Sequence, residues 1–222
     1  MIGDIHGRID HLGRLLARLP ADTRIVVAGD VCDRGPATRE VIEHLIERDA
    51  VGVRGNHEEW LIKWASGNGF DRLAMGLGAE ATLSSYGSVG RDAVEVSAES
   101  SLVPPAHLAW LESLGIVLDL HVEGEAYWVI HAGIPTGIPF IGMKADAIVP
   151  YLVRHHAHDL LWAFTPPEEM PPVDRTVIVG HRIVRHPVDC GRVLAVDTGC
   201  GTTRDGYLTA VVLPDRRFID SR

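Results

Sequence analysis

Cysteine is scarce in this chain of 222 residues, and its placement excludes two kinds of site. The three cysteines, Cys32, Cys190 and Cys200, are odd in number and form no CxxC pair. These features argue against a disulfide framework and against a zinc site built from thiolates. We therefore expect reduced thiols, with Cys32 a small buried apolar side chain rather than a redox switch.

Long apolar runs and excess positive charge are also missing. No uninterrupted apolar stretch approaches the roughly 20 residues that cross a bilayer, and the N-terminus lacks the basic and then apolar pattern of a secretory signal. We therefore expect a cytoplasmic protein that binds no membrane. The formal net charge is −9, whereas sequence-independent binding of nucleic acid depends on clustered Lys and Arg, so nucleic acid is not an expected partner.

The composition does provide for a large core and for metal ligands. Hydrophobic residues make up 46% of the sequence, so we expect residues 1–222 to form a single domain around a sizeable core. Twelve histidines in a chain of this length are a reason to search for a metal site.

The first third of the chain predicts repeated strand, turn and helix units. Strands are expected at 24–29 and 50–55, and helices at 10–19, at 36–48 and from about Glu58. This alternation predicts parallel strands in a sheet covered by helices. Only Met1 and Ile2 precede the first Gly-Asp turn, so we expect the natural chain to start further upstream.

The middle of the chain differs from both ends. Residues 63–114 are weakly periodic and contain Gly and Ser, which predicts a helical lid or insert. From Ile116 onward strands return, with a hairpin through residues 123–125 and further strands at 176–181, 192–197 and 207–213. We expect the histidines at 155, 156 and 158 to lie on the solvated surface of a polar connection.

Polar residues follow five of the predicted strands, in segments that also contain glycine, and all of them except an arginine are of types that can bind metal ions. Along the chain they are Asp4, His6, Asp30, Asp33, Arg34, Asn56, His57, His131 and His181. The C-terminal ends of parallel strands form the edge at which open α/β sheets build their sites, so we expect these side chains to converge. Six of these groups, those of Asp4, His6, Asp30, Asn56, His131 and His181, already exceed the needs of one metal ion, and two ions that share a carboxylate are the economical arrangement.

Five segments share their order and spacing with a known family. GDIHG, GDVCDRG, RGNHE, HAG and GH resemble the motifs of the phosphoprotein phosphatase family within the calcineurin-like metallophosphoesterases, and most of all those of small bacterial and phage serine/threonine protein phosphatases. The resemblance runs from residue 3 to about residue 213. It implies an α/β fold of four layers, in which helices cover both outer faces of a central β-sandwich.

The resemblance further implies that two divalent ions are bound, with Mn²⁺ expected and Fe or Zn as alternatives. The ligands that it implies are Asp4 and His6 for the first ion, Asp30 as the bridge, and Asn56, His131 and His181 for the second. Two such ions clamp the attacking and leaving oxygens of a phosphoester and lower the pKa of a water molecule. Water would then attack phosphorus directly, without a phosphoenzyme.

The remaining polar residues receive catalytic roles from the same resemblance. It implies that His57 is the general acid, that Asp33 orients it, and that Arg34 and Asn56 bind the phosphate. The chemistry agrees, because an imidazole held by a carboxylate can protonate a leaving oxygen and a forked cation matches phosphoryl oxygens. Glu58 is expected to serve the first turn of its helix.

Three functions are compatible with these residues. The main interpretation is a serine/threonine protein phosphatase that hydrolyses a phosphorylated protein or a small phosphoester. The alternative is a symmetrical dinucleoside tetraphosphate hydrolase, whose pattern resembles GDLVARGP and GNHD; this chain has Asp33 in place of its Ala and Glu58 in place of its Asp, whereas Pro36 matches it. A catalytically silent binding module would have lost a metal ligand, and none of the implied ligands is lost.

One position departs from the pattern of the bacterial relatives. They usually carry an arginine two residues after a tryptophan in a DLLW-like segment, where this chain has Phe164. We therefore expect weak handling of phosphomonoesters, or a preference for a substrate whose aromatic or apolar group contacts Phe164. Arg175 or Arg182 would supply the missing charge if a loop is shifted.

Overall fold

The computed structural model of the chain describes residues 1–138, 143 and 145–222. Its helical segments are α1 (Ile9–Leu16), α2 (Thr38–Glu47), α3 (Asn56–Ala65), η1 (Arg72–Leu77), α4 (Ala79–Ser85), α5 (Ala93–Ala98), η2 (Ser100–Leu102), α6 (Pro105–Ser113), α7 (Ala145–Trp162) and η3 (Pro167–Glu169). Its strands are β1 (Val26–Val27), β2 (Val51–Gly52), β3 (Val117–Val122), β4 (Glu125–Ile130), β5 (Thr176–Val179), β6 (Val188–Asp189), β7 (Val193–Ala195), β8 (Thr209–Val212) and β9 (Arg217–Asp220).

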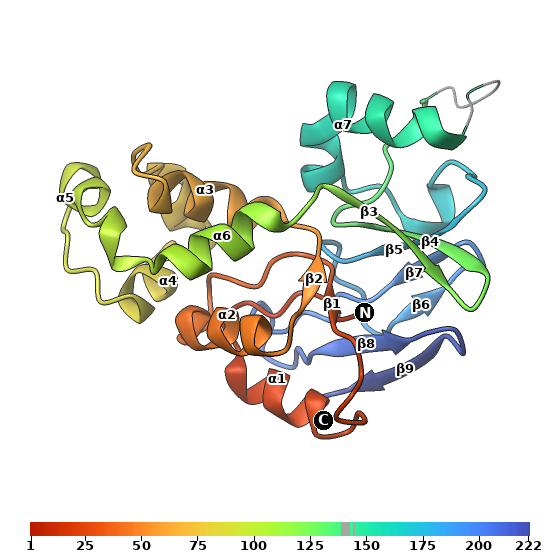
Figure 1. Cartoon of the computed structure of the whole chain (residues 1–222), viewed down its shortest axis with the longest axis horizontal. Helices are drawn as coiled ribbons and strands as arrows, with labels where there is room; N and C mark the ends of the chain where they lie inside the picture. Colours follow the sequence, from red (N-terminus) through yellow and green to blue (C-terminus); the bar gives the residue numbers. More distant parts are fainter. Residues whose placement is uncertain (139–142, 144) are drawn as a thin grey trace.

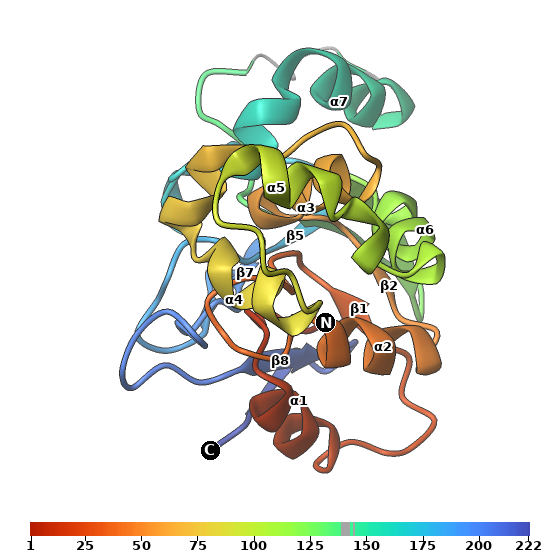
Figure 2. The same ribbon diagram turned by 90° about the vertical axis from the view of Figure 1, so that its left-hand side faces the viewer.

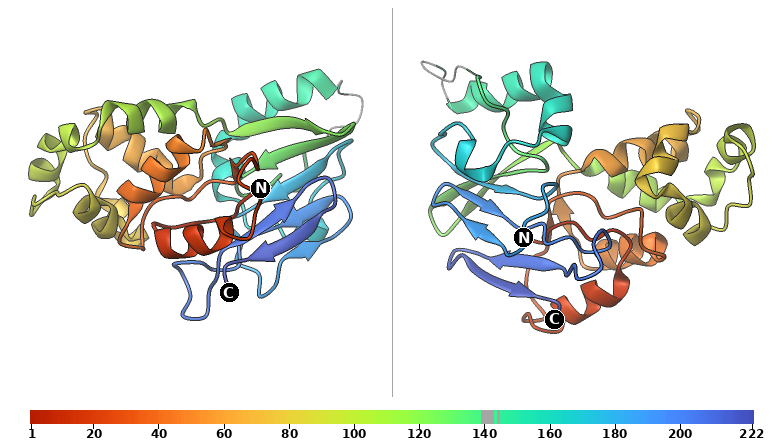
Figure 3. Two further views of the ribbon diagram at one scale, coloured as in Figure 1. Left: turned by 60° about the horizontal axis from the view of Figure 1, so that its bottom comes forward. Right: turned by 180° about the vertical axis from the view of Figure 1, so that it is seen from behind.

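Two β-sheets face each other in the middle of the molecule (Figures 1 and 3). In the first sheet β1 pairs in parallel with β2, β8 pairs antiparallel with β9, and Ile2 joins both pairs through Val27 and Ala210. The second sheet has the strand order β3-β4-β5-β7-β6, with parallel pairing between β4, β5 and β7. Tyr127 of β4 and Ile178 of β5 belong to the apolar cluster between the sheets.

Helices cover both outer faces of this sandwich (Figures 1 and 2). Apolar residues of α1 to α6 form one cluster with Ile2 and Val27 of the first sheet. On the other side, Leu152 and Leu160 of α7 pack with Trp128 of the second sheet. The four-layer α/β/β/α fold expected from the sequence is therefore confirmed.

The alternation predicted for the first third is present, although its strands are shorter than expected. Only Val26 and Val27 of the predicted strand 24–29 pair as β1, because the chain turns at Gly29, whose φ is 97°. The predicted hairpin between β3 and β4 is confirmed. Its turn residues Glu123 and Gly124 both have positive φ, 50° and 90°, as in the tight turns that suit the twist of a hairpin.

The prediction of a polar connection around residues 155–158 is wrong, because these residues belong to helix α7. Pro150 and the histidines obscure the apolar period, yet Leu152 and Leu160 are fully buried and fix the helix against the sheet. The helix is kinked at His156, where φ is −133°. The side chain of His158 is 81% exposed, in agreement with the expected solvated surface.

The segment 63–114 contains η1, α4, α5, η2 and α6, which project to one side of the sandwich in Figure 1. Helix α4 packs against α2, and α6 packs against both α2 and α3. The role of this segment as a lid or insert stays a prediction. Among the described helices, none combines the length and the hydropathy that crossing a bilayer requires.

Candidate active site

The loops that follow the first strands are joined by backbone hydrogen bonds at one edge of the sandwich. Ile5 and His6 both donate their N–H groups to the Asp30 carbonyl oxygen at 2.9 Å. Gly7 donates to the Val31 carbonyl oxygen at 2.8 Å. The loops that carry the first two predicted motifs therefore form one unit, which brings their polar side chains together.

The carboxylate of Asp30 lies at the centre of the site. Its Oδ1 atom is 3.3 Å from Nε2 of His131, and its Oδ2 atom is 3.7 Å from Nε2 of both His6 and His57. Asp30 belongs to two groups of side chains that could each hold a metal ion, one with His6 and His57 and the other with His131 and His181. This shared position is the one that a bridging ligand requires.

Asp4 and Asn56 lie beside these two groups. The carboxylate of Asp4 accepts the backbone N–H of His181, with distances of 3.1 and 3.2 Å to its two oxygens. The Oδ1 atom of Asn56 is 3.0 Å from Nε2 of His131. The structure thus brings all nine predicted side chains to one region, but it groups His57 rather than Asp4 with His6. The individual ligand roles stay predictions.

Glycine leaves the space that the ligands occupy. A Cβ atom at Gly55 would overlap Oδ1 of Asp30, and one at Gly180 would overlap Oδ1 of Asp4. A larger residue at either position would displace a carboxylate from the centre. The sequence expectation that glycine permits close approach is therefore borne out at these two positions.

Several non-glycine residues of the site loops have left-handed backbone conformations. His6, Asp30, Asp33, Arg34 and His181 have φ values between 47° and 71°. Such conformations cost on the order of 1–3 kcal/mol each and persist only where surrounding contacts hold them. The loops therefore direct polar groups into one centre at a cost in stability, as is typical of functional sites.

His57 and Asp33 form a buried pair that neighbouring side chains hold by hydrogen bonds. Nδ1 of His57 is 2.6 Å from Oδ2 of Asp33, and both residues are almost completely buried. The same carboxylate accepts the indole N–H of Trp60 at 2.8 Å and the hydroxyl of Thr82 at 2.8 Å. With Nδ1 donating to Asp33, Nε2 of His57 faces the centre and can exchange a proton there.

The guanidinium of Arg34 reaches the same centre from an exposed position. Its Nη1 lies 2.7 Å from Nε2 of His6, its Nη2 lies 3.2 Å from Nε2 of His57, and Nη1 also donates to the hydroxyl of Thr202. Its backbone N–H donates to the Gly78 carbonyl oxygen at 3.1 Å. Residues of the segment 63–114 therefore help to position Arg34 as well as Asp33.

Glu58 organises the loop that carries Asp30. This fully buried carboxylate accepts the backbone N–H groups of Gly55 at 2.7 Å, Asp30 at 2.8 Å and Val31 at 2.9 Å. It also accepts the thiol of Cys32, a buried side chain as expected. Stabilising the first turn of α3 is thus only part of its role, because Glu58 also fixes the backbone on which the central ligand stands.

Burial and like charge oppose ionisation of the carboxyl groups at the edge of the site. Burial, and then the nearby carboxylate of Asp197, raise the pKa of Asp4 well above its ordinary value. Burial raises the pKa of Asp197 to about 6. Burial also lowers the pKa of His6 to about 3 and that of His181 to about 4. The two imidazoles are therefore neutral near pH 7 and have a lone pair for a cation.

The residues present fit bound divalent metal ions. Nε2 of His181 is buried and has no hydrogen-bond partner in the described part of the chain. Asp4, Asp30 and Asp197 are buried close together, and a divalent cation would compensate their charge. Carboxylate, imidazole and amide oxygen are also the donors that such ions accept. The choice of Mn²⁺ stays a prediction.

Phe164 lies at the margin of the site. Its side chain is 66% exposed, and its ring centroid is 4.8 Å from that of His181. Nη1 of Arg182 donates to the Phe164 carbonyl oxygen at 2.5 Å, whereas Arg175 pairs with Asp119 at 3.3 Å. Of the two cations considered as substitutes for the missing arginine, the geometry favours Arg182.

Sequence reasoning missed several residues that hold the predicted ones in place. Trp60 lies three residues after His57 on α3, and this spacing on one helix face was an available signal. Asp197 lies two residues after the end of β7, so the rule that located the other strand-end residues would have located it too. Thr82 belongs to a segment without clear periodicity, and its contact with Asp33 had no signal in the sequence.

Known proteins resemble this chain in both sequence and fold. A family model described as calcineurin-like phosphoesterase matches residues 1–188. The asymmetrical bis(5′-nucleosyl)-tetraphosphatase PrpE of Oceanobacillus iheyensis is 25% identical, over 99% of this chain and 90% of the relative. PrpE of Bacillus subtilis is 28% identical, over 90% and 85%. The symmetrical bis(5′-nucleosyl)-tetraphosphatase of Dechloromonas aromatica is 35% identical, over 60% of this chain and 42% of the relative.

Solved structures agree on the architecture. A crystal structure provisionally identified as a diadenosine tetraphosphatase superimposes with a TM-score of 0.64 and 21% identity, over 99% of this chain and 90% of the other. A cold-active protein-tyrosine phosphatase of a Shewanella species superimposes with a TM-score of 0.57 and 16% identity, over 100% of this chain and 79% of the other. At these identities the likeness establishes the fold alone.

Proposed function

The chain belongs to the calcineurin-like phosphoesterase family, and we propose that within this family it hydrolyses dinucleoside tetraphosphates. Family membership makes it a metal-dependent phosphoester hydrolase. The observation that carries the finer proposal is the reach of the similarity, because the two relatives named asymmetrical tetraphosphatases align with 90–99% of this chain. The relative named symmetrical aligns with 60%, so we propose the asymmetrical cleavage.

Six residues would hold the metal ions, and they supply only nitrogen and oxygen donors. They are Asp4, His6, Asp30, Asn56, His131 and His181. Divalent ions bound there would polarise phosphoryl oxygens and lower the pKa of water. The loop contacts of Glu58 hold Asp30 in its central position, so this residue positions a ligand without being one.

Arg34 would bind the oxygens of the phosphoryl group under attack. Its guanidinium already spans the distance between His6 and His57, and it is exposed enough to meet a substrate. A planar fork of N–H donors matches two phosphoryl oxygens at once, and charge that grows on these oxygens strengthens both bonds. Arg34 would therefore contribute to substrate binding and to the transition state.

His57 would supply a proton to the leaving oxygen from Nε2. Asp33 accepts from Nδ1 at 2.6 Å, which fixes the ring and favours the protonated imidazole. The leaving group of a dinucleoside tetraphosphate is a nucleotide phosphate, which is a weaker base than an alkoxide and needs less help from an acid. We therefore expect His57 to contribute less to this reaction than to hydrolysis of an alkyl phosphate.

Serine/threonine phosphoprotein hydrolysis, the main interpretation of the motifs, becomes the second candidate. The observation in its favour is the pair of His57 with Asp33 at 2.6 Å, because the carboxylate favours the protonated imidazole that can act as an acid. Such an acid can protonate the serine oxygen that leaves from phosphoserine, which is a poor leaving group without a proton. The relatives that align over most of the chain favour the tetraphosphatase proposal.

A direct comparison of substrates separates the candidates. The enzyme loaded with Mn²⁺ is assayed with diadenosine tetraphosphate, a phosphoserine peptide and p-nitrophenyl phosphate, and the nucleotide products are separated by chromatography. We expect the highest kcat/KM on diadenosine tetraphosphate, with ATP and AMP in equal amounts. ADP as the sole product would instead indicate symmetrical cleavage. A higher kcat/KM on the phosphopeptide would overturn the proposal in favour of the second candidate.

A further inference from the structure

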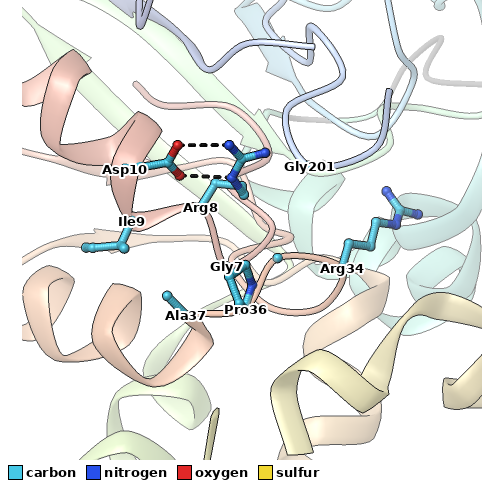
Figure 4. A pocket seen from close by; sticks show the side chains of 9 residues that line it. Gly7, Arg8, Ile9, Asp10, Arg34, Pro36, Ala37 and Gly201 are labelled. Carbon is cyan, nitrogen blue, oxygen red and sulfur yellow. Dashed lines mark hydrogen bonds and ion pairs between the residues drawn. The ribbon is translucent and has the colours of Figure 1, made fainter. Parts of the chain in front are cut away.

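A cavity of about 410 Å³ lies beside the candidate active site, between the beginnings of two helices (Figure 4). Residues 7–10 at the start of α1, residues 34–37 before α2, and Gly201 line it. None of the catalytic or metal-binding roles discussed above requires this space. Its volume falls within the roughly 300–1,000 Å³ that is typical of small-molecule sites.

The cavity adjoins the catalytic centre at Arg34. Arg34 lines it and also contacts both His6 and His57. A Cβ atom at Gly201 would lie 2.8 Å from Cβ of His6 and 3.4 Å from Cγ of Arg8. Gly201, whose φ is 68°, therefore packs closely against both the predicted metal ligand His6 and Arg8 of the cavity. A substrate held at the centre can therefore extend into this space.

The side chains that line the cavity are two cationic ones, one anionic one and three apolar ones: Arg8, Arg34, Asp10, Ile9, Pro36 and Ala37. Figure 4 shows Arg8 paired with Asp10 and Arg34 on another side, with Pro36 between the two arginines. The arginine side chains can bind phosphate oxygens, and a ribose or base ring can pack against the apolar side chains. Together these arginine and apolar side chains match the chemistry of a nucleoside phosphate.

Arg8 is held ready by its neighbour Asp10. Its Nε donates to Oδ1 of Asp10 at 2.9 Å and its Nη2 donates to Oδ2 at 2.8 Å. Within the described part of the chain, Nη1 of Arg8 makes no hydrogen bond to protein. The side chain is 33% exposed. This pair orients the guanidinium and leaves one of its donors for a ligand.

We propose that this cavity binds the nucleotide portion of the substrate that extends beyond the cleaved phosphorus, with Arg8 and Arg34 contacting phosphate oxygens. Ile9, Pro36 and Ala37 contact the nucleoside. This inference rests on the proposed function, and it names the subsite that would distinguish a dinucleoside tetraphosphate from a small phosphomonoester. A compact substrate such as p-nitrophenyl phosphate reaches Arg34 but not Arg8.

The test compares Arg8→Gln with Arg14→Gln. Arg14 stands on the same helix, carries the same charge and also approaches Asp10, at 3.5 Å, but it does not line the cavity. The Mn²⁺-loaded enzymes are assayed with diadenosine tetraphosphate and with p-nitrophenyl phosphate. ATP is added as an inhibitor of the second reaction at a fixed excess of free metal, and its Kd is measured by calorimetry. Circular dichroism and thermal unfolding verify that each variant folds.

For Arg8→Gln we expect KM for diadenosine tetraphosphate, and both the inhibition constant and the Kd of ATP, to rise about 10- to 100-fold, as for loss of a charge-assisted contact. The kcat/KM of Arg8→Gln on p-nitrophenyl phosphate should change far less. For Arg14→Gln all of these constants should stay within about twofold of wild type, because an exposed ion pair contributes little. Equal losses on both substrates, or unchanged constants for ATP, would overturn the subsite. If Arg8→Gln does not fold, Arg8→Lys takes its place, because it keeps the charge and loses the fork.

The same data separate the two proposals. If wild type fails to hydrolyse diadenosine tetraphosphate while ATP still inhibits in a manner that depends on Arg8, the proposed function is wrong and the nucleotide subsite stands. If wild type hydrolyses the tetraphosphate and Arg8→Gln leaves KM unchanged, the function stands and the subsite is wrong.

Discussion

Replacement of Glu58 by glutamine should destabilise the fold although the two side chains have almost the same shape. The carboxylate is fully buried and accepts three backbone N–H groups at 2.7–2.9 Å, from Gly55, Asp30 and Val31. Glutamine retains one acceptor oxygen and places an N–H₂ group at the other position. Two backbone donors then face another donor whichever oxygen is replaced: those of Gly55 and Asp30 if the amide nitrogen replaces Oε2, and those of Val31 and Cys32, the latter at 3.3 Å, if it replaces Oε1.

The magnitude follows from the number of bonds lost. A hydrogen bond to a charged group contributes about 1.5–3 kcal/mol, so the loss of two amounts to about 3–6 kcal/mol. Burial raises the pKa of Glu58, so removal of its charge offsets part of this loss. We expect a net decrease of about 2–4 kcal/mol in the free energy of unfolding, because the lost bonds outweigh the relief of desolvation. For a chain of this size that is a fall in Tm of roughly 4–16 °C.

Glu59→Gln is the matched control. Glu59 is the next residue on α3, its side chain is 46% exposed, and it pairs with Arg54 at 2.8 Å. An exposed pair contributes about 0–1 kcal/mol, so this variant should remain close to wild type. Both variants are unfolded with urea in excess chelator, so that bound metal does not add to stability. A free energy of unfolding for Glu58→Gln within about 1 kcal/mol of Glu59→Gln would refute the reasoning, because it would mean that no net bond is lost.

Three further predictions concern catalysis, the rim of the site and the thiols. His57→Ala should lower kcat about 10²- to 10⁴-fold on an alkyl phosphate and clearly less on p-nitrophenyl phosphate, and equal losses would remove His57 from the acid role. Phe164→Arg should lower KM and the inhibition constant of free phosphate about 10- to 100-fold if a charge-assisted clamp is missing, whereas unchanged constants in a folded, metal-loaded variant would show that another cation supplies it. Cys190 is exposed, while Cys32 and Cys200 are buried and burial raises their thiol pKa values, that of Cys200 to about 12. A thiol reagent at pH 8 should therefore label only Cys190 until the protein is unfolded, and fast labelling of a buried thiol would contradict this structure.

The positions of the site residues could be predicted because they depend on a general property of α/β folds. Asp30, His131 and His181 each follow a strand, and the ends of neighbouring strands meet at one edge whatever the rest of the sequence. Glycine beside these residues indicated the close approach that Gly55 and Gly180 permit. Strand periodicity and strand-end chemistry thus sufficed for the α/β class and for the convergence of the polar groups, whereas the four-layer arrangement was predicted from the family resemblance.

Contacts between distant segments could not be predicted in this way. Thr82 reaches Asp33 from a helix 49 residues further along the chain, and no local pattern encodes that distance. Helix α7 was missed because Pro150 interrupts its period, although packing of its buried leucines against the sheet outweighs the helix propensity of one residue. The cavity at Arg8 depends on how two helices and the loop at Gly201 meet, which only the folded chain defines.

Metal content and activity of Asp30→Asn, measured beside wild type, test the central claim most directly. Asp30 lies between two groups of metal-competent side chains, so its loss should weaken both sites together. After reconstitution with Mn²⁺ and removal of free metal, elemental analysis should find two ions per wild-type chain and fewer than one per variant chain, with hydrolysis of diadenosine tetraphosphate lost in the variant. Two tightly held ions in Asp30→Asn, or full turnover by wild type stripped of metal, would contradict the account.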